Sequence, residues 1–412
     1  METTLAPKDQ LPVEAPFISP APADPPPSRC WAEVDLAALR HNVGAVRADV
    51  GSETTILAIV KADGYGHGMV SVARALRDTG EVSDFGVASL AEARHLRDGL
   101  PQARVTILSP ALPEERAGVV QHGFLPWLSS LAEAGDYARH AAAHGHDARH
   151  PFAVEIKLDT GMGRMGVLEG DFDALLAAVR RLPTLRVTGV LTHLPSPDED
   201  ADFTAAQLAR MAALQARLAA ESPTTDDRPP ATSLSPLRFH AQNSAGLLGY
   251  ARDGRNLVRP GLMLYGASPL PVFQGRLRPV LTLKTRLTLV RTLPAGHGVS
   301  YGRTFRTAEP TRVGTLAAGY ADGYPRHLSN VGAEALVRGR RCPVLGRVTM
   351  DQVMLDLSAL PEGVAAGEEV VLLGRQGGEE VSAGELAGKS GTIPWEIFTG
   401  LTARVARRYL PA

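Results

Sequence analysis

The chain has 412 residues, 44% of them hydrophobic, and its formal net charge is -1. This length predicts two domains, because domains usually span ~100–200 residues. The balanced charge argues against a nucleic-acid binder, which needs a basic face, and no apolar run of the sequence reaches the ~18 residues of a membrane-spanning helix. We therefore expect neither a nucleic-acid partner nor a membrane partner.

Residues 1–28 are rich in proline and lack the basic and apolar regions of a secretory signal. We interpret them as a disordered arm. The two cysteines of the sequence are Cys30 and Cys342. A disulfide framework is therefore not expected, and a cytoplasmic location fits.

From Trp31 onwards, short apolar runs alternate with segments of helical periodicity. Eight runs are expected to be strands, at residues 55–61, 85–89, 105–109, 124–129, 152–160, 187–194, 237–243 and 257–266. Helices are expected between most of them, at residues 68–77, 91–97, 131–143, 171–182 and 203–219. Apolar strands that alternate with helices predict a covered parallel sheet. Eight such units predict a (β/α)8 barrel over residues 37–268, with a doubly wound open sheet as the alternative.

The sequence pattern changes after the barrel: strand-like runs separated by Gly and Pro turns predict a second, mostly β domain. Its strands are expected at residues 279–293, 312–318, 335–337, 342–356 and 368–373, and its helices at 384–388 and 397–407. Residues 31–35 are strand-like and are expected to join its sheet. We assign residues 29–36 and 269–412 to this domain. The loop at residues 222–236, rich in Pro, Ser, Thr and Asp, is expected to be a mobile surface insert.

Reactive side chains of a (β/α)8 barrel lie at the carboxyl ends of its strands. The first run ends in Lys61, whose amine becomes nucleophilic where burial favours the neutral form, and which can then form a Schiff base. Tyr65 follows among glycines and is expected near the same barrel mouth. A strand-end lysine that merely reaches water is the alternative interpretation.

The fifth run carries Lys157 and leads into a glycine-rich turn that contains Arg164. An arginine in this place can bind a carboxylate or a phenolate through two hydrogen bonds. A tight turn with a surface arginine is the alternative. The sixth run ends with His193, for which a structural role is the alternative to a catalytic one.

The last two runs predict an anion site. Asn243 and Ser244 begin a helix-like segment, and Arg259 precedes the amides at Gly261 and Leu262. Hydroxyls and amides at a helix N-terminus bind anions, and a phosphate site after strands seven and eight is a recurrent barrel device. A lysine at one strand end and a phosphate cradle at two others is the combination that pyridoxal phosphate (PLP) requires. The sequence contains no HExxH, paired CxxC or EF-hand pattern, so no metal is expected.

Eight motifs stand in order between residues 31 and 409: VKADGYGHG, KLDTGMGRMG, THL, HAQNSAG, RPGLMLYG, VSYGRTF, GYADGYPR and GRVTMDQ. On these motifs the chain resembles the alanine racemase family, PLP-dependent enzymes built on a barrel. The resemblance implies an isomerase that interconverts L- and D-alanine, forms a homodimer with shared active sites and supplies D-alanine for cell-wall peptidoglycan. A racemase of broader specificity, an amino-acid decarboxylase and a non-catalytic PLP-binding protein are the alternatives.

The resemblance also implies roles for individual residues. Lys61 would hold PLP and act as one acid/base at Cα, and Tyr301 of the partner subunit would act as the other. The phosphate would be held by Tyr65, Ser244 and the Gly261 region. The family has a second tyrosine near the end of the chain, where this sequence has Trp395. One phosphate hydrogen bond is therefore expected to be lost, re-aimed or supplied by another group.

Arg259 would contact the pyridine nitrogen of PLP, and His193, in contact with Arg259, would couple it to the second base. Arg164 would contact the phenolic oxygen of PLP and the substrate carboxylate. Lys157 corresponds to the carbamylated lysine of the family, which orients that arginine. Substrate contacts from the partner chain would come from Met350 and Asp351, the amide of Met350 binding the carboxylate.

Overall fold

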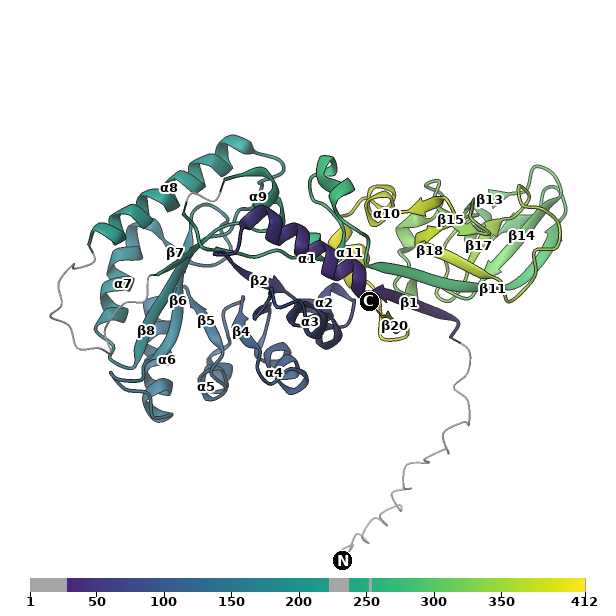
Figure 1. Ribbon diagram of the computed structural model, residues 1–412. Coiled ribbons are helices and arrows are strands. Elements are labelled where there is room, and N and C mark those ends of the chain that lie inside the picture. The colour runs from purple at the N-terminus through teal and green to yellow at the C-terminus, as the bar shows by residue number, and fades with distance from the viewer. Residues whose placement is uncertain (1–27, 222–236, 252–253, 412) are drawn as a thin grey trace, which may run out of the picture.

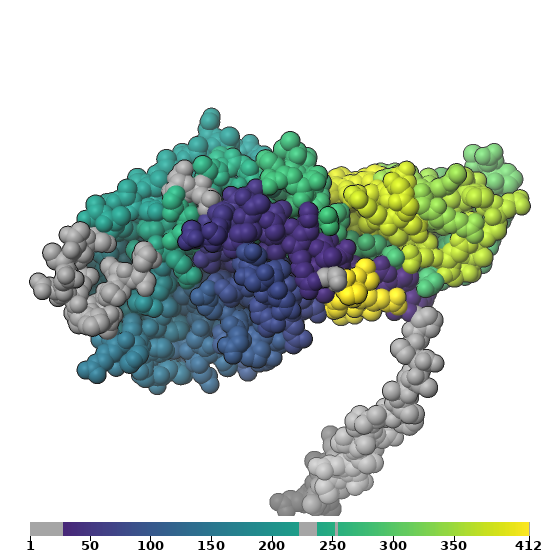
Figure 2. Space-filling view, in the orientation of Figure 1, coloured from purple at the N-terminus to yellow at the C-terminus, as the bar shows by residue number. Residues whose placement is uncertain are grey.

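The computed structural model describes residues 28–221, 237–251 and 254–411. They form two lobes, a barrel and a mostly β domain, side by side in an elongated molecule (Figure 1, Figure 2). The expected arm, apart from residue 28, and the expected loop at residues 222–236 lie outside the described residues.

The first lobe is a barrel of parallel strands in the order β10-β2-β3-β4-β5-β6-β8-β9. The strands are β2 (Thr55–Ile59), β3 (Asp84–Val87), β4 (Arg104–Ile107), β5 (Leu125–Leu128), β6 (Phe152–Asp159), β8 (Leu185–Leu191), β9 (Arg238–His240) and β10 (Leu257–Val258), with a short β7 (Val167–Leu168) beside β6. The two ends of the sheet meet where the Arg259 backbone N–H donates to the Gln242 carbonyl at 3.0 Å. The expected (β/α)8 barrel is confirmed, and the open sheet was the wrong alternative.

Helices surround this barrel on the outside (Figure 1). They are α1 (Leu36–Val50), α3 (Met69–Arg77), α4 (Leu90–Gly99), α5 (Arg116–Gln121), α6 (Leu131–Ala143), α7 (Phe172–Arg180), α8 (Ala201–Ala220) and α9 (Ser244–Gly249). Several begin at a short polar residue that follows a strand. Ser89 accepts from the third residue of α4 and Ser130 from the third residue of α6, so both hydroxyls cap a first turn.

The second lobe is a nine-stranded sheet in the order β16-β15-β18-β11-β1-β20, with β14 beside β11, β17 beside β14 and β19 beside β18. Its strands are β1 (Cys30–Asp35), β11 (Leu281–Leu293), β14 (Thr311–Leu316), β15 (Glu334–Val337), β16 (Arg340–Pro343), β17 (Val353–Asp356), β18 (Glu369–Gln376), β19 (Glu379–Val381) and β20 (Ala406–Leu410). The hairpin β12 (Gly298–Val299) and β13 (Phe305–Arg306) and the helices α10 (Ala383–Ser390) and α11 (Pro394–Thr399) complete it. Strand β1 pairs with β11, so the start of the described chain belongs to this sheet.

Two expected strands are shorter than the sequence pattern indicated. Residues 257–266 form a strand only as far as Val258, because Pro260 has no N–H to extend the ladder. A 3-10 helix at Leu262–Tyr265 follows. Residues 342–356 form two strands rather than one, since the chain turns at Gly346, whose φ is 68°.

The tail at residues 397–407 was expected to be helical, and that prediction is wrong. Helix α11 ends at Thr399, before Gly400, and the chain then runs as β20 in parallel register with β1, from Trp31 opposite Ala406 onwards. The free edge of β1 therefore decides the conformation of the tail, and helical periodicity in the sequence does not reveal such an edge.

Within the described ranges, no helix combines the length and the hydropathy that crossing a membrane requires. Nor do His, Cys, Asp or Glu side chains of those ranges gather in threes as ligands of a metal ion would.

Candidate active site

Lys61 lies just beyond β2 and opens α2 (Lys61–Tyr65), a short turn that runs left-handed. Ala62, Asp63 and Tyr65 have φ angles of 51°, 53° and 50°, a conformation that costs roughly 1–2 kcal/mol for each L-residue. The first expected strand thus ends at Ile59. Such strain persists where the surroundings hold it, and it is typical of functional sites.

The carboxylate of Glu92, the third residue of α4, holds this turn. Its Oε1 accepts from the Ala62 backbone N–H at 2.8 Å, and its Oε2 accepts from the Ala88 backbone N–H at 2.7 Å. Burial and the charge of Arg164 lower the pKa of Lys61, and Glu92 opposes them. The Lys61 amine is therefore closer to its neutral, nucleophilic form than a free lysine is.

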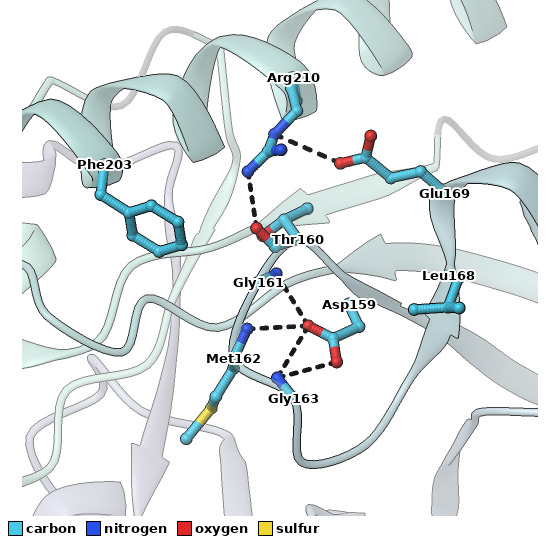
Figure 3. Close-up of a pocket in the computed structure, with 9 residues that line it drawn as sticks. All are labelled: Asp159, Thr160, Gly161, Met162, Gly163, Leu168, Glu169, Phe203 and Arg210. Carbon is cyan, nitrogen blue, oxygen red and sulfur yellow. Dashed lines mark hydrogen bonds and ion pairs between the residues drawn. The ribbon is translucent and has the colours of Figure 1, made fainter.

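The loop that carries Arg164 is folded around Asp159 at the end of β6 (Figure 3). The Asp159 carboxylate accepts from the backbone N–H groups of residues 161, 162 and 163, at 2.9, 2.8 and 3.0 Å. Arg210 of α8 donates to the Thr160 carbonyl at 2.6 Å and secures the same loop. The predicted glycine-rich turn thus forms, and it leaves Arg164 exposed at the barrel mouth.

Three basic residues lie close together inside the mouth. Burial, Arg259 and Arg164 lower the pKa of Lys157 to about 6. Burial and Arg259 also lower the pKa of His193 well below its usual value. Both side chains are therefore neutral near pH 7, because a second buried charge beside a guanidinium is unfavourable.

Arg259 is 3% exposed and is held by hydrogen bonds. Its Nη1 donates to His240 Nδ1 at 2.5 Å, and its Nη2 donates to the carbonyls of Thr192 and Ala241 at 2.7 and 2.8 Å. The imidazole hydrogen-bonded to Arg259 is thus His240, whereas His193, which the resemblance placed in contact with Arg259, lies near enough for the Arg259 charge to lower its pKa. His240 stands in the HAQNSAG motif, and its position two residues beyond Arg238, on one face of β9, was the sequence signal for it.

The expected anion site is partly assembled. The Gly261 backbone N–H donates to Ser244 Oγ at 3.0 Å, and a Cβ at position 261 would lie 2.5 Å from the Tyr65 hydroxyl. Asn243 caps α9 by accepting from the Gly246 backbone N–H at 3.0 Å. Leu262, fully buried, begins the next 3-10 helix. A phenol, a hydroxyl and glycine backbone therefore meet at one place, with Asn243 behind them.

Trp395 packs beside this cradle, against the buried core. Burial raises the pKa of Tyr65 to about 12, and a hydrogen bond from Trp395 opposes that rise. The Tyr65 ring also stacks on Tyr265, with 4.8 Å between ring centroids. The indole in place of the family's tyrosine thus bonds to the remaining tyrosine of the cradle.

The remaining expected site residues lie on the second lobe. Tyr301 is 72% exposed and Met350 is 52% exposed. Tyr301 stands between β12 and β13, and β13 lies at the far side of the second lobe from the barrel (Figure 1). Asp351 is exposed and pairs with Arg404 at 2.9 Å. Within one chain, these three residues are not brought to Lys61.

Comparison with known proteins identifies relatives of both lobes. The family profile described as alanine racemase, N-terminal domain, matches residues 34–269, and the one described as alanine racemase, C-terminal domain, matches residues 280–409. An alanine racemase of Symbiobacterium thermophilum is 42% identical over 383 residues, which cover 92% of this chain and 96% of the relative. One of Geobacter sulfurreducens is 40% identical over 386 residues, with the same coverage of 92% and 96%.

Solved structures agree with these relatives. The alanine racemase of D-cycloserine-producing Streptomyces lavendulae superimposes with a TM-score of 0.83 at 34% identity, covering 94% of this chain and 98% of that one. The alanine racemase of Bacillus anthracis, solved with bound L-Ala-P, superimposes with a TM-score of 0.81 at 32% identity, covering 94% and 96%.

Proposed function

The chain belongs to the alanine racemase family and is an isomerase, and from this premise we propose that it interconverts L- and D-alanine with PLP and two bases from two subunits. The observation that carries the proposal is Lys61, an amine of lowered pKa held at the barrel mouth by a strained turn. A lysine of this kind forms Schiff bases with aldehydes.

The donor set around Lys61 fits PLP. Tyr65, Ser244 and the amides near Gly261 would hold its phosphate, since glycine at 261 leaves open the space that a Cβ would take from the Tyr65 hydroxyl. Arg259 would face its ring nitrogen and Arg164 its phenolic oxygen. When bound, PLP supplies the electron sink that makes the Cα proton of an amino acid removable.

Arg259 decides whether the ring nitrogen of PLP receives a proton or only a hydrogen bond. Burial lowers its pKa only to about 10, so the guanidinium stays protonated and donates a hydrogen bond without giving up its proton. Decarboxylases of this architecture place an acidic residue there, which argues against the decarboxylase alternative. Arg164 would bind the substrate carboxylate, and a carbamate formed on the neutral amine of Lys157 would orient it.

Racemisation removes a proton from one face of Cα and delivers another to the opposite face. Lys61 would serve one face and Tyr301 of the partner subunit the other, and positioned groups of this kind accelerate proton transfer about 10²–10⁴-fold. His193 would assist the tyrosine, and Met350 and Asp351 of the partner subunit would contact the substrate.

Two sets of exposed apolar side chains support a homodimer. Leu112, Leu131 and Leu168 follow β4, β5 and β6 at the barrel mouth and are 57%, 61% and 63% exposed. Tyr301 and Met350 form the second set, on the other lobe. Two-fold pairing would bring each set against its opposite in the other copy and bury both.

From the resemblance alone, we also assign the D-alanine product to peptidoglycan synthesis in the cytoplasm. Each domain would have its own function: residues 37–268 would bind PLP, and the domain of residues 29–36 and 269–412 would supply the second base.

Borohydride reduction followed by peptide mapping tests the proposal. The PLP label is expected on Lys61, and Lys61→Ala is expected to lose the label, the visible absorbance and racemisation of L-alanine. A label on another lysine, or an unlabelled wild-type protein, would overturn the assignment. Wild-type protein that releases carbon dioxide from amino acids and leaves L-alanine unracemised would favour the decarboxylase.

A further inference from the structure

The interior of the barrel contains a polar column where such barrels usually hold branched apolar side chains. Glu155 on β6 is 1% exposed and stands in register with Trp127 on β5 and Gly189 on β8. Arg238 on β9 is the next residue in the same layer. The Trp127 indole N–H donates to Glu155 Oε2 at 2.9 Å, and an Arg238 nitrogen lies 3.1 Å from Oε1.

Gly189 makes room for this carboxylate. A Cβ at that position would lie 2.7 Å from Glu155 Oε1 and 2.9 Å from the Arg238 carbonyl oxygen. Burying an ion pair in a barrel usually brings no net stability over apolar packing. The layer is nevertheless shaped around the Glu155 carboxylate, which suggests a role beyond stability.

His240 connects this layer to the barrel mouth. Its ring is fully buried, with Nε2 3.2 Å from Glu155 Oε2 and Nδ1 2.5 Å from Arg259 Nη1. A guanidinium only donates and a carboxylate only accepts. The proton must therefore sit on Nε2 and the lone pair on Nδ1, which selects one neutral tautomer of His240.

The charge of Glu155 also connects it to Arg259. Burial lowers the pKa of Arg259, and Glu155 is the group that opposes this. Lys157 stands two residues beyond Glu155 on the same face of β6, in the direction of the mouth. The carboxylate thus lies beneath the cluster of basic residues and reaches Arg259 through one imidazole.

We propose that Glu155 is a positioning residue for racemisation, which holds Arg259 through the Nε2-protonated tautomer of His240 so that the guanidinium meets the PLP ring nitrogen as a fixed, charged donor. The inference rests on the proposed function, because it takes the ring nitrogen as the partner of Arg259. Without Glu155, His240 is free to adopt the other tautomer, whose Nδ1–H would face the donors of Arg259 and push the guanidinium aside.

The test compares Glu155→Leu, Glu155→Gln and, as a matched control, Trp127→Phe. Trp127→Phe removes a different donor to the same carboxylate, keeps an aromatic ring beneath Arg259, whose guanidinium carbon lies 5.7 Å from the Trp127 ring centroid, and leaves the hydrogen bonds of His240 in place. The first readout is the ¹⁵N spectrum of histidine-labelled, cofactor-free protein, which reports the tautomer of His240 whether or not PLP binds. The second is the ¹⁵N shift of the ring nitrogen in holoenzyme prepared with labelled PLP.

Wild type and Trp127→Phe are expected to show a single, Nε2-protonated His240 and the same ring-nitrogen shift. Glu155→Leu should mix the tautomers, move the ring-nitrogen shift and lower kcat by about 10-fold or more, with KM for alanine little changed, as loss of an outer partner of a functional histidine does. Glu155→Gln keeps the side-chain volume and an acceptor for Nε2–H. It should keep the tautomer and still move the ring-nitrogen shift, because the charge is gone.

An unchanged ring-nitrogen shift in Glu155→Gln, or an unchanged tautomer in a folded Glu155→Leu, would overturn the proposal and leave Glu155 a structural residue. If Glu155→Leu does not fold, the glutamine variant decides alone. Failure of the proposed function would look different, since wild-type protein incubated with PLP would then carry none on Lys61, while the tautomer of His240 would still be measured in the cofactor-free protein.

Discussion

The barrel mouth and the second lobe hold their functional residues in opposite ways. Lys157 is 2% exposed in the barrel, whereas Tyr301 is 72% exposed on the second lobe. Burial and neighbouring charges change the pKa values of Lys61, Lys157 and His193. We infer from this contrast that one chain holds the cofactor-binding residues of the site in place by burial. Its exposed second-lobe residues would complete the site of a second copy.

The largest expected effect tests whether the two halves come from different chains. Lys61→Ala and Tyr301→Ala homodimers should each be nearly inactive as racemases, and Tyr301→Ala should impair abstraction of the Cα proton from L-alanine more than from D-alanine. Unfolding and refolding the two variants together in equal amounts should restore about a quarter of wild-type activity, because half of the dimers are mixed and each contains one intact site.

The recovered racemase activity is measured against each variant refolded alone. No recovery, with mixed dimers shown to form, would mean that Lys61 and Tyr301 of one chain act together, and the comparison between the lobes would fail. Equal, minor losses of Cα-proton abstraction from L- and D-alanine in Tyr301→Ala would remove its role as a base.

A second prediction uses the burial of Lys157. Its folded pKa of about 6 lies below its usual 10.5, so between these values the unfolded state binds one proton more and stability rises with pH. In buffer free of carbon dioxide, wild type should gain roughly 2.5–3 kcal/mol between pH 7 and pH 9 relative to Lys157→Met. Urea unfolding of both proteins at both pH values measures this. Parallel pH profiles would show that the amine is not deprotonated by burial.

A third prediction concerns the turn after Lys61. Glu92→Gln should lower the free energy of unfolding by about 1–3 kcal/mol, because an amide cannot accept from both Ala62 and Ala88 and leaves one N–H unpaired. It should also lower the pKa of Lys61 further, since Glu92 raises it. Urea denaturation and the pH dependence of amine labelling report the two effects. The contrary outcome is an unchanged labelling profile.

The smallest effect is expected on the second lobe. Asp351→Ala removes the exposed pair with Arg404 and leaves Arg404 its second partner, Asp322, at 3.4 Å; exposed pairs contribute little because water and salt screen them. We expect no measurable change of Tm in calorimetry. A clear drop would show that the second lobe is also held by its own charges, which would blur the contrast with the barrel.

Much of the barrel could be predicted from local patterns. The expected helix at residues 131–143 matches α6, and that at residues 171–182 lies within two residues of α7 at each end. Capping residues such as Ser130 and apolar periodicity are local signals. The tail was mispredicted because β20 exists only where the edge of β1 receives it.

The site residues also divide into those that the sequence indicated and one that only the tertiary structure revealed. The motifs name Lys61, Arg164 and Arg259, and the family resemblance names Tyr301. No motif names Glu155, because a glutamate in a strand is ordinarily exposed, and only closure of the barrel brings it to His240 at 3.2 Å.

Order along the chain thus determined which elements form, since capping, periodicity and turn residues act over a few positions. Packing of strands far apart in sequence decided which groups lose water, which of them stay neutral and which imidazole holds the arginine. Burial and charge act through space, and spatial neighbours 85 residues apart, such as Glu155 and His240, are settled only when the barrel closes.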